Sequence, residues 1–230
     1  MNSKSTALPD LDHYFSLGEA AFEEIIARVS TMQPQTFLEL GSGRSTVRFA
    51  AALDGTKIFS IESGPTYASQ TRALLDQHGI KSAEVIETPI RRQYHGLALY
   101  DGFDFGQDTL RLLPTVIDVL LVDGPPGLCF GGREAALYAL FERVRIGGLV
   151  IVDDLFRRHE QRAVRHWQKR FPGAFEVAFS ETGHQLAYLT KVANPEFRRF
   201  TTVPWSHYAA ALWGYVLKFT EPWRTGKEPR

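Results

Sequence analysis

The sequence predicts an α/β protein built on a doubly wound, mostly parallel sheet of seven strands that ends in a C-terminal antiparallel hairpin. Short apolar runs alternate with segments of helical periodicity, the order expected of a parallel sheet with helices on both faces. The runs 119–122 and 149–152 contain only Val, Ile and Leu, which is typical of strands buried on both faces. A short turn, 180–184, separates the last two runs, so we expect them to pair antiparallel.

The individual elements follow from this alternation. The expected strands are Thr36–Leu40, Lys57–Glu62, Ala83–Glu87, 117–123, 149–153, Phe175–Phe179 and 185–190. The expected helices between them are 45–53, 66–78, 133–144 and 161–171. An amphipathic segment, 17–29, precedes the first strand and is expected to pack on an edge of the sheet. The stretch 91–113 mixes aromatic residues with Gly and Asp, so we expect a long loop of the kind that is often functional.

Length and composition narrow the class of protein. The 230 residues suit one well-buried domain, 1–230, with a helical segment at 11–30 and an aromatic extension at 194–230. Within that extension, 209–219 is expected to form a helix that covers the core, lines a substrate or makes a homodimer contact. The formal net charge of zero indicates no nucleic-acid partner. A polar start, a single cysteine and the lack of a membrane-length apolar run predict a cytoplasmic protein without a membrane partner.

The most informative stretch is 36–46, where an apolar strand runs into a glycine turn and then a helix. Gly41 and Gly43 lack a Cβ, so the backbone can approach a ligand closely, and amides at the start of the helix can face its polar atoms. About twenty residues later the second strand ends in Glu62, where a carboxylate can bind the hydroxyls of a ribose. The pattern predicts a nucleoside-containing cofactor at the mouth of the sheet.

The residues around the turn discriminate between cofactors. A dinucleotide fingerprint requires Gly or Ala three residues after the second glycine, where this chain has Thr46. Glu39 would repel a pyrophosphate but suits a cationic ligand such as S-adenosylmethionine, which carries an ammonium and a sulfonium. Through Glu39, Gly41 and Gly43 the chain resembles the class I S-adenosylmethionine-dependent methyltransferases, with Ser45 in place of the usual third glycine. The cofactor-binding residues that this resemblance implies are Glu39, Gly41, Ser42, Gly43, Glu62, Ser63 and Asp123.

Three further carboxylates, Asp123, Asp153 and Asp154, end the fourth and fifth expected strands. If these strands are neighbours, the carboxylates converge and repel each other unless a cation shares the site, and oxygen ligands suit Mg²⁺. The pattern resembles the metal-dependent O-methyltransferases of the catechol and macrolide sugar types, over roughly 37–171, which implies Mg²⁺ at all three aspartates. Two alternatives remain: Asp153 or Asp154 caps the next helix, and Asp123 stabilises its own turn. Arg133 either orients an aspartate or begins its helix.

We therefore expect an enzyme that moves a methyl group from S-adenosylmethionine to a small-molecule acceptor, at a hydroxyl group if the metal is present. The catechol type carries a lysine base after its first metal aspartate, and the corresponding stretch 124–127 has none. The expected catalytic residues are Asp123 and His159, with His95 and His184 as other candidates for the base. The alternatives are a metal-free methyltransferase, an NAD-linked oxidoreductase, and a non-catalytic cofactor-binding scaffold.

Overall fold

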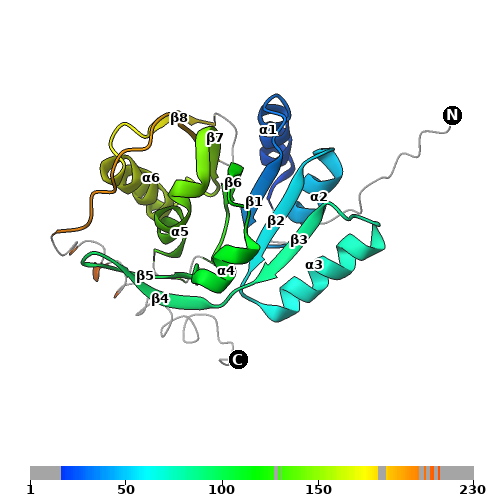
Figure 1. Cartoon of the computed structure of the whole chain (residues 1–230), viewed down its shortest axis with the longest axis horizontal. Coiled ribbons are helices and arrows are strands. Elements are labelled where there is room, and N and C mark those ends of the chain that lie inside the picture. Colours follow the sequence, from blue (N-terminus) through cyan, green and yellow to red (C-terminus); the bar gives the residue numbers. More distant parts are fainter. Residues whose placement is uncertain are drawn as a thin grey trace.

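A seven-stranded sheet runs through the centre of the molecule in the order β3-β2-β1-β6-β7-β9-β8 (Figure 1). The computed structural model describes residues 17–126, 129, 131–180, 185–201, 205, 208, 209 and 212. The strands of the sheet are β1 (Thr36–Leu40), β2 (Lys57–Glu62), β3 (Ala83–Glu87), β6 (Ile117–Val122), β7 (Val144–Val152), β8 (Phe175–Phe179) and β9 (Ala187–Lys191). All pairs are parallel except those of β9 with β7 and β8. The predicted fold class, including its closing hairpin, is confirmed.

Helices cover both faces of the sheet, α1, α2 and α3 on one side and α5 and α6 on the other (Figure 1). Their bounds are α1 (Glu19–Ser30), α2 (Arg44–Ala52), α3 (Pro65–Gln77), α5 (Gly132–Leu140) and α6 (Arg158–Arg170). Successive residues of a strand face opposite sides, so Phe37 packs with α1 and α2 while Leu38 packs with α5 and α6. The same alternation turns Glu39 toward α2.

Helix α1 lies over the middle of one face, so the prediction that segment 17–29 packs on a sheet edge is wrong. Its buried residues are Ala21, Phe22, Ile25 and Val29, spaced to form one apolar stripe. They belong to the same hydrophobic cluster as Val119 of β6 and Ile151 of β7. The central strands are apolar on both sides, and α1 supplies the cover that their second face needs.

The prediction of a long loop over 91–113 is also wrong. This stretch forms an antiparallel pair, β4 (Ile90–His95) and β5 (Ala98–Phe103), followed by the short helix α4 (Gln107–Leu112). The chain reverses at Gly96, whose φ of +65° suits glycine. Ala98 and Tyr100 are buried, and β5 packs against α5. Charged residues on the exposed side of β4 obscured the two-residue period in the sequence.

Several element ends differ from the predicted ones. Strand β7 begins at Val144 rather than 149, and the helix expected over 133–144 ends at Leu140 and continues as a 3₁₀ turn, Phe141–Arg143. Of the helix expected at 11–30 the structure describes α1, and residues 11–16 lie outside the described part, as do residues 181–184 of the expected turn and most of 209–219. Within the described residues, no helix combines the length and apolar character that crossing a bilayer requires.

A buried carboxylate, Glu134, holds the β4–β5 hairpin to α5 and α6. Its Oε1 accepts hydrogen bonds from the hydroxyls of Tyr100 at 2.7 Å and Tyr138 at 2.8 Å. The same oxygen lies 2.8 Å from Nδ1 of His166, and the indole of Trp167 donates to the Glu134 backbone carbonyl. Burial alone would raise the pKa of Glu134, but the hydrogen bonds from His166 and the two tyrosines outweigh it, and the pKa is lowered.

We expect Glu134→Gln to reduce the free energy of unfolding at pH 7 by about 2–3 kcal/mol, because an amide replaces an ionised acceptor of three donors. Since the folded pKa lies below the usual 4.5, this contribution is present above pH 4.5 and is lost as the pH falls through the folded pKa. Urea unfolding of both proteins at pH 7 and near pH 4 measures it. Tyr138→Phe, which removes one donor, is the control; equal stability of Glu134→Gln and wild type at pH 7 would contradict the expectation.

Candidate functional site

Four parallel strands end in register at one edge of the sheet. Leu40 of β1, Ile61 of β2, Val122 of β6 and Val152 of β7 lie side by side where these strands end. The residues that follow them are Gly41, Glu62, Asp123 and Asp153. The predicted cofactor and metal residues therefore lie on neighbouring strand ends, which is where ligands bind in open α/β sheets.

The glycine turn is hydrogen-bonded and closely packed at Gly41, and it is open at Gly43. Gly41 has φ +105°, and its N–H donates to the Ile61 carbonyl at 2.8 Å. Gly124 lies against the turn, where a Cβ would stand 2.8 Å from the Leu40 carbonyl oxygen. Gly43 has the extended φ of 171°, which any residue adopts, and a Cβ there would meet nothing within 4 Å. The backbone does not require glycine at Gly43, and the free space beside it suits a ligand.

Glu39 is fully buried beneath this turn. Its Oε2 accepts hydrogen bonds from Thr46 Oγ1 at 2.5 Å and Ser60 Oγ at 3.2 Å. Its Oε1 has no partner among the described residues. Burial raises the pKa of Glu39 to about 7, and the charge of Asp123 adds to the rise. A cationic group of a ligand at Oε1 would stabilise the ionised carboxylate.

Glu62 binds the glycine turn itself, which the sequence did not reveal. Its Oε2 accepts from the Ser42 N–H at 3.1 Å and from Ser42 Oγ at 3.3 Å. Its Oε1 accepts from the backbone N–H groups of Ser63 and Gly64, both at 2.7 Å. The predicted residues Ser42, Glu62 and Ser63 are thus brought together, and a ribose would have to exchange with some of these donors.

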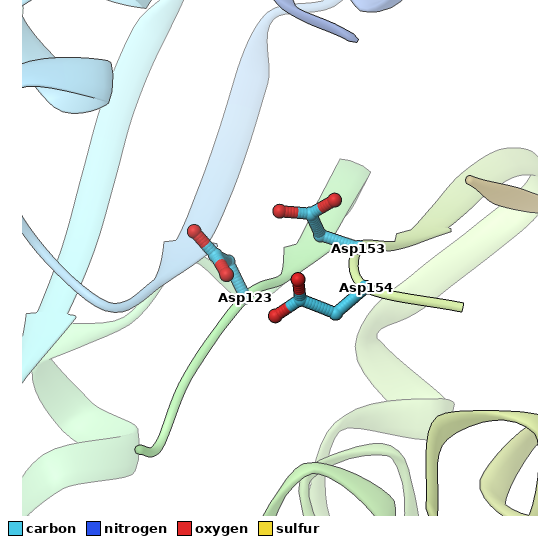
Figure 2. Close-up of side chains that lie close together, drawn as sticks. All are labelled: Asp123, Asp153 and Asp154. Atoms are coloured by element: carbon cyan, nitrogen blue, oxygen red, sulfur yellow. The ribbon is translucent and has the colours of Figure 1, made fainter. Parts of the chain in front are cut away.

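Asp123, Asp153 and Asp154 form one cluster, with one carboxylate oxygen from each lying within 4.8 Å of the others. Figure 2 shows Asp123 at the end of β6 and the pair at the end of β7, with the three carboxylates gathered in one place. The helix-capping alternative for the pair is wrong, because the N-cap of α6 is Arg157. Asp154 has a positive φ of 59°, which is uncommon outside glycine.

The guanidinium of Arg133 pairs with two of these aspartates. Nη2 of Arg133 lies 3.2 Å from Asp123 Oδ1 and 3.1 Å from Asp154 Oδ2. Its Nη1 donates to the Asp153 backbone carbonyl at 3.3 Å. Arg157 adds a second ion pair to Asp154, at 2.8 Å. Arg133 thus orients aspartates, one of the two roles that the sequence left open.

Negative charge remains in excess in spite of Arg133. Burial raises the pKa of Asp123 to about 7, Arg133 opposes the rise, and Asp153 and Asp154 add to it. Burial also raises the pKa of Asp153, whose Oδ1 is buried and has no partner among the described residues. Around octahedral Mg²⁺ adjacent ligand oxygens stand about 2.9 Å apart and opposite ones about 4 Å. The three aspartates could therefore hold a small divalent cation only if their carboxylates moved closer together and Arg133 moved away.

Among the described residues, no hydrogen bond or ion pair joins the predicted bases His159 and His95 to the three aspartates. His159 is exposed on the first turn of α6, and its Nδ1 lies 3.2 Å from Nη2 of Arg162. Because a guanidinium only donates, Nδ1 is the acceptor, and His159 must release Arg162 before it can take a proton there. His95 has a buried Nε2 without a partner among the described residues, and His184 lies outside them. The catalytic role of His159 stays a prediction.

Sequence reasoning missed some side chains that complete the site. Thr46 and Ser60 hydrogen-bond to Glu39, and Thr46 occupies the position where a dinucleotide motif carries Gly or Ala. Glu160 lies on α6, buried, with Oε1 3.8 Å from Nε of Arg133. The threonine could have been found from the motif position, whereas the contact of Glu160 depends on how α5 and α6 pack.

Comparisons with known proteins agree with this geometry. Residues 38–155 match the model of a family described as a methyltransferase domain. Solved structures with a similar fold include the O-methyltransferase of Bacillus cereus in complex with SAH, which is 14% identical, with a TM-score of 0.59 over 78% of this chain and 84% of that one. Others are TomG of Streptomyces achromogenes in complex with SAM, 15% identical, with a TM-score of 0.60 over 78% and 82%, and SAH-bound PaMTH1 of Podospora anserina, 14% identical, with a TM-score of 0.61 over 77% and 80%.

The chain belongs to this family: it is a methyltransferase with the class I fold of S-adenosylmethionine-dependent enzymes. Family membership favours methyl transfer over the oxidoreductase and scaffold alternatives.

Two glycine substitutions should separate the structural side of the turn from its ligand side. Gly124→Ala places a methyl group 2.8 Å from a backbone oxygen, so we expect a loss of about 1–3 kcal/mol in the free energy of unfolding. Gly43→Ala meets free space, so we expect nearly unchanged stability but an affinity for S-adenosylmethionine reduced about tenfold or more. Urea unfolding and calorimetric titration measure both. Full affinity in Gly43→Ala would show that no ligand approaches this glycine.

Proposed function

We propose that this chain transfers the methyl group of S-adenosylmethionine to a hydroxyl group of a small molecule, with Mg²⁺ at Asp123, Asp153 and Asp154. The observation that carries the proposal is the position of these aspartates on strand ends adjacent to the glycine turn. Donor and acceptor would then lie side by side. A protein, nucleic acid or membrane acceptor is not part of the proposal, and a homodimer remains compatible with it.

The donor would lie across the ends of β1 and β2. Glu39 Oε1 would accept the ammonium of the methionine end, since it is buried and lacks a partner among the described residues. Gly43 would let the backbone approach, and Glu62 would exchange its bonds to Ser42 for the ribose hydroxyls. In this arrangement Ser42 and Ser63, which hydrogen-bond to Glu62, would lie beside the cofactor.

Methyl transfer is a displacement at carbon: the bond from oxygen to the methyl carbon forms as the bond from carbon to sulfur breaks. The acceptor oxygen loses its proton and the sulfonium becomes a neutral thioether. The protein mainly has to align oxygen, methyl and sulfur, and such positioning can supply on the order of 7–11 kcal/mol. A divalent ion, when bound, would lower the pKa of the acceptor hydroxyl. Asp123 lies next to the glycine turn, so an acceptor bound at Asp123 would lie close to the donor bound at that turn.

A metal-free reaction is the second candidate, and Arg133 favours it. The guanidinium already pairs with Asp123 and Asp154, as a cation would. The pKa of Asp123, raised by burial to about 7, suits a group that takes a proton from a hydroxyl near neutral pH. In this version Asp123 rather than His159 is the base.

We expect Glu39→Gln to weaken the binding of S-adenosylhomocysteine, which keeps the ammonium, by about 10- to 100-fold at pH 8. Wild-type affinity should rise between pH 6 and 8, as Glu39 loses its proton with a pKa of about 7, and the variant should lack this rise. Because the pKa of Glu39 is raised, its ionisation lowers the stability of the wild-type protein between about pH 4.5 and 7. At pH 8 the unliganded Glu39→Gln variant should therefore not be less stable than wild type.

Calorimetric titration at several pH values measures this effect. Ser60→Ala, which removes one hydrogen bond to Glu39 but no charge, is the matched control. Identical pH profiles for wild type and Glu39→Gln would remove Glu39 from the cofactor site.

The proposed reaction is tested by following the formation of S-adenosylhomocysteine with a panel of vicinal diols, phenols and amines. With Mg²⁺ at the aspartates, we expect hydroxyl acceptors to react and both chelation and Asp153→Asn to slow turnover by at least about tenfold. Full activity in chelator would select the metal-free version. Activity restricted to amines would contradict the hydroxyl assignment.

A further inference from the structure

Arg133 occupies the position that a cation would take among the aspartates. Its side chain is only 10% exposed, and a single nitrogen, Nη2, bridges Asp123 and Asp154. A second nitrogen holds the backbone of Asp153. The guanidinium brings one positive charge and only donor nitrogens. A divalent ion and Arg133 therefore compete for the same two carboxylates.

A third carboxylate, that of Glu160, lies within reach of the same guanidinium. Glu160 is 4% exposed, and its Oε2 has no hydrogen-bond partner among the described residues. Its Oε1 lies 3.8 Å from Nε of Arg133, an ion-pair distance beyond that of a hydrogen bond, and that nitrogen is also without a hydrogen bond. A small rotation of the arginine side chain would turn this loose contact into a hydrogen-bonded pair.

We propose that Arg133 competes with the metal for the aspartates. The site is closed to a cation when Arg133 pairs with Asp123 and Asp154, and it opens when Arg133 moves to Glu160. The proposal rests on the metal site of the proposed function. It gives Arg133 a positioning role, because the residue would control whether the cation enters without touching donor or acceptor. In the closed state Arg133 faces Asp123 and Asp154, and in the open state the metal would face the aspartates while Arg133 faces Glu160.

The test is calorimetric titration of the full chain with Mg²⁺ or Mn²⁺ alone, without cofactor or acceptor. Arg133→Met removes the competing charge and keeps an apolar stem of similar length, so we expect metal binding at least about tenfold tighter than in wild type. The matched control is Arg157→Met, which removes an equal charge from Asp154 but at a side chain 41% exposed. Solvent screens that charge, so its effect should stay below about threefold.

Glu160→Gln provides an independent test of the proposal. Without the charge of Glu160 the guanidinium loses its alternative partner, so we expect metal binding several-fold weaker than in wild type. If Arg133→Met does not fold, Arg133→Lys replaces it, because an ammonium on a shorter stem cannot reproduce the contacts of the guanidinium. The increase of the melting temperature with added metal should then be larger in Arg133→Lys than in wild type.

Metal affinity that is unchanged or weaker in the Arg133 variant would overturn the proposal, as would the lack of metal binding in both proteins. Binding in the variant alone would support it, with wild-type arginine holding the site closed. Titration of the same proteins with S-adenosylhomocysteine measures cofactor binding independently of metal binding. A chain that binds this nucleoside but no metal would lose the present proposal and keep its function as a metal-free methyltransferase.

Discussion

Parallel pairing in register is the constraint from which the site follows. Residues Leu40, Ile61, Val122 and Val152 pair across four adjacent strands, so the chain leaves the sheet at one level in all four. Every residue after such an end is brought to the same edge whatever its place in the sequence. A glycine turn follows β1, Glu62 is the last residue of β2, and aspartates follow β6 and β7. A shift of one residue in any pair would turn the side chains of that strand to the opposite face.

Glu134 differs from Glu39 and Asp123 in the partners of its carboxylate. Glu134 accepts three hydrogen bonds on one oxygen, and its pKa is lowered in spite of burial. Glu39 and Asp123 lie at the strand ends, and burial raises the pKa of each to about 7. An ionised group that is buried with too few partners destabilises the folded protein unless a ligand completes its surroundings. The raised pKa values therefore mark the ligand edge of the sheet, whereas Glu134 belongs to the scaffold.

Helix α5 links Glu134 to the aspartates at the strand ends. Consecutive residues of a helix point about 100° apart, so Arg133 reaches the aspartates while Glu134 faces α6 and the β4–β5 hairpin. The start of the helix is tightly packed, since a Cβ on Gly132 would lie 2.5 Å from the Asp101 carbonyl oxygen of β5. Helix α5 therefore contacts the β4–β5 hairpin through Gly132 and Glu134, and the aspartate cluster through Arg133.

The sequence by itself determined the sheet and the residues at its edge, because strand periodicity and glycine turns are local patterns. From Glu39, Gly41 and Gly43 it predicted the methyltransferase class, and from Asp123, Asp153 and Asp154 the acidic cluster. The tertiary structure decided that Arg133 pairs with that cluster, that Glu62 holds the glycine turn, and that 91–113 forms a hairpin on α5. These features join residues distant in the chain, and such contacts depend on how helices pack on the sheet, which no local period encodes.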